Sequence, residues 1–118
     1  MEQPVSKGTQ EDVERIVRRD FRPSEVDAAF ALLNSYETTP FKERPARVRL
    51  AALKCAEGDL AKLKCELQEA LVDFRDVIIA AEYPSYGELT AQSQKPSPEA
   101  LEESIREDWK QYSEWLSR

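Results

Sequence analysis

The fold is decided by residues 48–71, which read VRLAALKCAEGDLAKLKCELQEAL. In the first half of this stretch, apolar side chains recur at the spacing of one helical face: Val48, Ala51, Ala52 and Cys55. Leu50 and Leu53 project to nearly the opposite side of the same helix. A helix that is apolar on two sides is usually surrounded by others. We therefore expect this helix to lie at the centre of the fold.

The second half of the stretch predicts a helix that pairs with the first. Its leucines form a narrow stripe: Leu60, Leu63, Leu67 and Leu71. Gly58 is the natural C-terminal cap of the first helix, and Asp59 is a good N-cap for the second. Because the connection is only Gly58-Asp59, the two helices should run antiparallel. We expect this hairpin to form the core of the fold.

Capping residues and prolines mark further helices on both sides of this hairpin. Thr9 and Asp12 match the capping box that opens a helix. Boundaries are expected before Pro23 and Pro84, because proline disfavours the helical conformation in the preceding residue. Pro98 fits the first turn of a last helix. The expected helices cover residues 9–22, 24–36, 42 or 45 to 57, 59 onward, 73–83 and 97–116. Residues 1–8 are expected to be flexible, and residues 84–96 to form a loop.

These patterns predict the fold class and the domain organisation. No run alternates apolar and polar residues, so strands are not supported. We predict an all-α fold of about six helices, packed as antiparallel hairpins in a compact orthogonal or solenoid-like bundle. The chain has 118 residues with 41% hydrophobic content, the size of a single domain. Without an export signal or the ~20 apolar residues of a membrane span, a cytoplasmic protein that does not bind membranes is expected.

Composition argues against several classes of function. The chain contains no histidine, which removes the usual general base near neutral pH and the commonest zinc ligand. The formal net charge of −6 argues against nucleic-acid binding, because that affinity comes mainly from cationic side chains at phosphates. Glycine-rich phosphate loops are also missing. We expect no cofactor and no nucleic-acid partner, whereas an acidic surface suits solubility or a basic protein partner.

The two cysteines, Cys55 and Cys65, fall on the two helices of the central hairpin. Measured from the turn at Gly58, they are offset along the helix axes by ~6 Å, and Cys65 points away from the leucine stripe. We therefore expect two free thiols. Two cysteines without histidine also lack the closely paired spacing of a zinc site, so no metal site is expected.

Aromatic residues gather in the C-terminal third of the chain: Tyr83, Tyr86, Trp109, Tyr112 and Trp115. Such residues are favoured in protein interfaces, but a small domain also uses them to dock its last helix. Both interpretations remain open. Asp108 projects into the same sector of the last helix as the apolar residues. It is therefore expected at the edge of the core, paired with a cation or facing a partner.

Four short motifs resemble a known family: VRLAALK at 48–54, EGDL at 57–60, DFRDV at 73–77 and AEYP at 81–84. The pattern is similar to a family of small uncharacterised bacterial proteins, and it covers roughly the middle third of the chain. The resemblance implies a bacterial all-helical domain and brings no established activity, cofactor or ligand. Most matched residues are explained as core or caps. Arg75 and Glu82 have no evident structural role, which makes them candidates for a functional surface.

Two classes of function remain open. The first is a non-catalytic protein-binding module, and a specific form of it is an acidic immunity-type inhibitor that blocks a basic toxin. The second is a small enzyme or ligand-binding protein with a carboxylate and arginine site: Asp73, Arg75, Asp76, Glu82 and Tyr83. A homodimer through the last helix is compatible with either class. The candidate binding residues are Arg75, Glu82, Tyr83, Tyr86, Asp108, Trp109 and Trp115.

Overall fold

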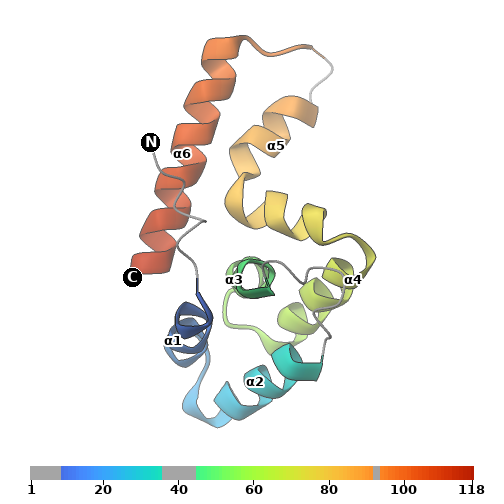
Figure 1. The fold of residues 1–118 in the computed structure, drawn as a ribbon, viewed down its shortest axis with the longest axis vertical. Helices are drawn as coiled ribbons and strands as arrows, with labels where there is room; N and C mark the ends of the chain where they lie inside the picture. The colour runs from blue at the N-terminus through green and yellow to red at the C-terminus, as the bar shows by residue number, and fades with distance from the viewer. Residues whose placement is uncertain (1–8, 36–44, 92–93) are drawn as a thin grey trace.

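The structure is a computed structural model that describes residues 9–35, 45–91 and 94–118 (Figure 1). These residues form six α-helices, one short 3-10 helix and no strand, which confirms the all-α prediction. The elements are α1 (Gln10–Asp20), η2 (Pro23–Glu25), α2 (Val26–Ser35), α3 (Pro45–Ala56), α4 (Leu60–Glu82), α5 (Pro84–Ala91) and α6 (Pro98–Ser117). The expected flexibility of residues 1–8 and the alternative helix start at Lys42 lie outside the described residues. None of the described helices combines the length and apolar character needed to cross a membrane.

Helix α3 is the central helix of the fold. Figure 1 shows it end-on near the middle of the molecule, and it packs against α1 and α4. Its apolar side chains are buried on both sides: Val48, Leu50, Ala51, Ala52, Leu53 and Ala56. The prediction of a central helix, drawn from its two apolar sides, is therefore confirmed.

The turn between α3 and α4 has the predicted caps. Glu57 and Gly58 adopt positive φ angles of 51° and 78°, a conformation that glycine adopts without steric cost. A Cβ atom added to Gly58 would lie 2.5 Å from the backbone oxygen of Asp20, so glycine also permits α1 to approach closely. The Asp59 side chain accepts a hydrogen bond from the Lys62 backbone N–H at 3.1 Å. The predicted hairpin is confirmed.

Helix α4 is longer than expected and bent. Leu63 and Leu67 are buried, whereas Leu71, which was expected to continue the stripe, is 42% exposed. Asp73 then has non-helical backbone angles (φ −152°, ψ 99°), and its Oδ1 accepts a hydrogen bond from the Arg75 backbone N–H at 3.0 Å. An aspartate side chain can satisfy backbone groups in this way where a helix is interrupted. The helices predicted from residue 59 and over 73–83 are therefore two parts of one bent helix.

The expected loop over residues 84–96 is wrong for its first part, because Pro84–Ala91 form α5. Pro84 stands at the first helical position, where its missing N–H costs nothing. The boundary predicted at Tyr83 is correct, since Tyr83 is the C-cap of α4 and its backbone N–H donates to the oxygen of Ile79 at 2.9 Å. The small polar residues that suggested a loop are compatible with a helix held by tertiary contacts.

Helix α6 begins as predicted, with the Ser97 hydroxyl accepting from the Ala100 backbone N–H at 3.2 Å. Its C-terminal part docks on α1 through two core residues, Tyr112 and Trp115, whose rings lie 5.5 Å apart. The Arg19 guanidinium lies 5.4 Å from the Trp115 ring centroid and donates to the Trp115 backbone oxygen at 2.7 Å. Of the two roles expected for the aromatic residues, Tyr112 and Trp115 therefore have the second, docking of the last helix.

Candidate functional site

The clearest concentration of buried polar groups lies where α3, α4 and α6 meet. The Glu82 carboxylate is fully buried and pairs with Arg47 in a two-pronged arrangement, with Nη2 to Oε1 at 2.7 Å and Nε to Oε2 at 3.0 Å. The hydrogen bonds that Arg47 donates to Glu82 raise the pKa of Arg47, and burial opposes this change. Glu82 therefore has a structural role that its sequence context did not reveal.

Asp108, on α6, caps the first turn of α5, although it lies 23 positions from Ser85 in the sequence. It is fully buried, and its Oδ1 and Oδ2 accept hydrogen bonds from the backbone N–H groups of Ser85 and Tyr86, both at 2.9 Å. These two N–H groups belong to the first turn of α5, where no local partner exists. Asp108 forms no ion pair among the described residues, and it is not at an exposed edge. The prediction gave Asp108 an edge position, a cation or a partner protein, whereas among the described residues its carboxylate binds two backbone N–H groups.

Gln111 and Tyr112 complete this cluster, which we call the junction: Arg47, Glu82, Asp108, Gln111 and Tyr112. The Gln111 side-chain amide donates to the backbone oxygens of Ala81, at 3.2 Å, and of Asp108, at 3.0 Å. The Tyr112 hydroxyl is buried without a hydrogen-bond partner among the described residues, and burial raises its pKa, with a further contribution from Glu82. Carboxylates, guanidinium and amide are all engaged within the chain, so the junction orients helices rather than offering reactive groups.

The structure brings most of the predicted site residues together around the junction. Tyr83 and Tyr86 are half-buried and stack edge-to-face with ring centroids 6.5 Å apart. Trp109 is half-buried, and its indole nitrogen is buried without a partner among the described residues. Trp115 belongs to the core instead.

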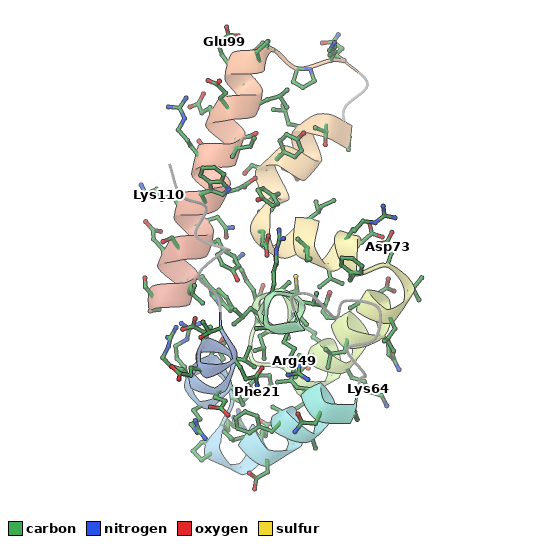
Figure 2. The ribbon with its side chains drawn as sticks, viewed as in Figure 1. Phe21, Arg49, Lys64, Asp73, Glu99 and Lys110 are labelled. Atoms are coloured by element: carbon green, nitrogen blue, oxygen red, sulfur yellow. The ribbon has the colours of Figure 1, made fainter. Side chains whose placement is uncertain are left out.

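Arg75 lies elsewhere, at the bend of α4. Its side chain is 76% exposed and pairs with Asp73 at 3.0 Å, and Figure 2 shows Asp73 at the bend of α4, on the side of the molecule opposite α6. Hydrogen bonding between the two side chains lowers the pKa of Asp73 and raises the pKa of Arg75. The carboxylate and arginine site proposed from the sequence is therefore not assembled. Glu82 is bound to Arg47 in the interior, whereas Arg75 faces solvent.

Above the junction, α5 and the first part of α6 stand side by side, away from the other helices (Figure 1). We call this part, residues 84–91 and 94–110, the arm. Its described residues include no buried apolar side chain: only Ser104 and Asp108 are buried there. The larger apolar side chains of the arm are half-buried, and none packs against the main core: Tyr86, Leu89, Leu101, Ile105 and Trp109. The arm thus carries apolar surface that the chain itself covers only in part.

The exposed side of the arm is acidic. Four exposed carboxylates follow α6, and we call them the acidic ridge: Glu99, Glu102, Glu103 and Glu107. Two cations, Arg106 and Lys110, interrupt it, and Arg106 lies 3.8 Å from Glu102 across solvent. Figure 2 shows Glu99 at the outer end of α6 and Lys110 on the side that faces away from α5. Nothing in the local sequence distinguishes these carboxylates from the charged face of an ordinary solvated helix.

A surface hollow of about 940 Å³ lies at the other end of α6, among side chains of α1, α3 and α6. None of the residues proposed as a carboxylate and arginine site lines it. Within the described residues no group of three or more histidine, cysteine or carboxylate side chains is arranged to hold a metal ion. Cys55 and Cys65 are free thiols, and burial raises the pKa of Cys55 to about 11.

Comparison with other proteins identifies no relative of this chain. No protein-family model, curated protein or solved structure matches this chain. The functional argument therefore rests on the residues of the chain itself.

Proposed function

We propose that this protein is a non-catalytic binding module whose arm contacts another protein. The observation that carries the proposal is the absence of any buried apolar side chain among the described residues of the arm. A helical hairpin normally buries its apolar stripe, and each Å² of apolar surface left in water forgoes roughly 25 cal/mol. A partner that covered Leu101, Ile105 and Trp109 would recover part of this free energy.

The charge of the arm indicates what kind of partner would fit. An interface of this type has an apolar centre and a polar rim, and here the rim would include the acidic ridge. A partner with a basic surface around an apolar patch is complementary, and the attraction would accelerate association at low salt. An immunity-type inhibitor that blocks a basic toxin is one specific form of this function. A bacterial, cytoplasmic setting is part of the same proposal.

The junction supports a binding role rather than a catalytic one. Asp108 and Glu82 are buried and fully engaged: Asp108 holds α5 against α6, and Glu82 holds α4 against α3. A rigidly held arm loses little conformational entropy when a partner binds it, which favours affinity. Catalysis at the junction would instead need these groups to be free to react, whereas they are bound to one another and to the backbone.

The test compares two charge-reversal variants with the same total charge. Glu103→Lys/Glu107→Lys changes the acidic ridge, and Glu14→Lys/Glu69→Lys changes exposed positions on α1 and α4. Each tagged protein, once shown by circular dichroism to be folded, is used at low salt to capture proteins from host cells for quantitative mass spectrometry. We expect a basic protein that the wild type and the Glu14/Glu69 variant retain and the ridge variant loses. Equal retention by both variants would overturn the proposal.

A further inference from the structure

The hollow between α1, α3 and α6 contains charged groups that form no ion pair within the described part of the chain. Its lining consists of Trp115, Gln111 and six charged residues: Arg19, Asp20, Lys54, Glu57, Glu114 and Arg118. Its volume of about 940 Å³ falls within the range of small-molecule sites in proteins. It lies outside the arm, so what it binds is independent of the proposed function.

One wall of the hollow is built from groups that are already paired. The Arg19 Nε lies 2.8 Å from the Asp20 Oδ1, and the Arg19 Nη1 donates to the Trp115 backbone oxygen at 2.7 Å. The guanidinium also lies over the Trp115 ring. Arg19 and Asp20 therefore neutralise each other and fix the position of the indole. They form a rigid, partly apolar surface rather than free binding groups.

The other charged side chains of the hollow have no partner among the described residues. Lys54 is half-buried and forms no ion pair or hydrogen bond through its amine, and burial lowers its pKa. Glu57 and Glu114 line the same space without an ion pair, and Arg118 contributes a second unpaired guanidinium. None of these cations lies within 4.0 Å of one of these carboxylates. Two positive and two negative side chains thus line one hollow without an ion pair between them among the described residues.

We propose that this hollow binds a small zwitterion, a molecule that carries a carboxylate and an ammonium group, as amino acids do. The ligand carboxylate pairs with Lys54 and Arg118, and the ligand ammonium pairs with Glu57 and Glu114. A ligand with a single charge is attracted by one pair and repelled by the other, whereas a zwitterion satisfies both. Because Lys54 is partly removed from water, its ion pair with a ligand is stronger than one at an open surface.

The experiment uses three probes of equal chain length: 6-aminohexanoate, hexanoate and hexylamine. Each is titrated into ¹⁵N-labelled full-length protein, and amide chemical shifts are followed by NMR. We expect 6-aminohexanoate to shift the amides of residues 54, 57, 114 and 115 in a saturable way, and to bind about tenfold more tightly than either probe with a single charge. Equal binding of all three probes, shifts scattered over the surface, or no saturable shift would overturn the proposal.

Variants separate the two halves of the site. Lys54→Met should weaken 6-aminohexanoate about tenfold and should not weaken hexylamine, whose ammonium does not use this lysine. Glu114→Gln should weaken 6-aminohexanoate about tenfold and should not weaken hexanoate, which has no ammonium group to pair with this glutamate. The matched controls Lys62→Met and Glu69→Gln change exposed residues of α4, and they should bind 6-aminohexanoate as the wild type does. If the controls weaken binding as much as the site variants, the probe is recognising net charge and the site assignment is wrong.

Discussion

Replacing Asp108 should release α5 from the rest of the molecule. The buried carboxylate accepts two backbone hydrogen bonds, from Ser85 and Tyr86, each 2.9 Å long. A hydrogen bond to a charged group contributes about 1.5–3 kcal/mol, and an N-cap contributes about 1 kcal/mol. Because water can reach part of the freed first turn, we expect Asp108→Ala to cost about 3 kcal/mol. Asp108→Asn keeps one acceptor but turns an NH₂ group toward the other N–H, so it should cost about 2 kcal/mol.

Two measurements test this prediction. Urea unfolding followed by circular dichroism gives the change in the free energy of unfolding, and hydrogen exchange shows where protection is lost. We expect the amides of residues 85–91 to lose protection first, while the amides of α3 follow the global stability. Glu107→Ala, which removes the neighbouring exposed carboxylate, should stay within about 0.5 kcal/mol of the wild type. If Asp108→Asn matched this control and left α5 equally protected, the capping role would be refuted.

Three further predictions follow from buried or strained groups. Arg47→Met should cost about 3 kcal/mol in urea unfolding by leaving Glu82 buried without a partner, and adding Glu82→Leu should recover most of the loss. Gly58→Ala should lower stability by at least about 2 kcal/mol, measured in the same way, because φ is 78° and the added Cβ would meet α1. At pH 8 a thiol reagent should modify Cys65 in the folded protein and Cys55 only after unfolding. The reason is that the raised pKa of about 11 keeps the half-buried Cys55 thiol protonated. Equal rates of modification of the two cysteines in the native state would contradict this.

The elements that the sequence predicted correctly are those whose signals are local. Thr9 caps α1 with Asp12 three residues away, Asp59 caps α4, and Ser97 caps α6. The two apolar sides of α3 likewise identify a central helix from one continuous stretch. Such contacts join residues within one helical turn, so spacing along the chain determines them.

The features that the sequence missed depend on distant partners. Helix α5 looked like a loop because its cap, Asp108, comes from a different helix 23 positions from Ser85. Glu82 had no visible role because Arg47 is 35 positions away. The arm presents a third case. Leu101 and Ile105 have the spacing of a core stripe, and only the packing shows that this stripe is incompletely buried. Helical periodicity predicts which face is apolar but not what covers it.

The central claim, that the arm contacts another protein, is tested most directly by hydrogen exchange of the free chain and of the chain with its captured partner. The account predicts that added protection is concentrated in residues 84–91 and 98–110, with little change in α1 and α2. Protection confined to α1, α2 or the first part of α4, with the arm exchanging as in the free protein, would contradict it.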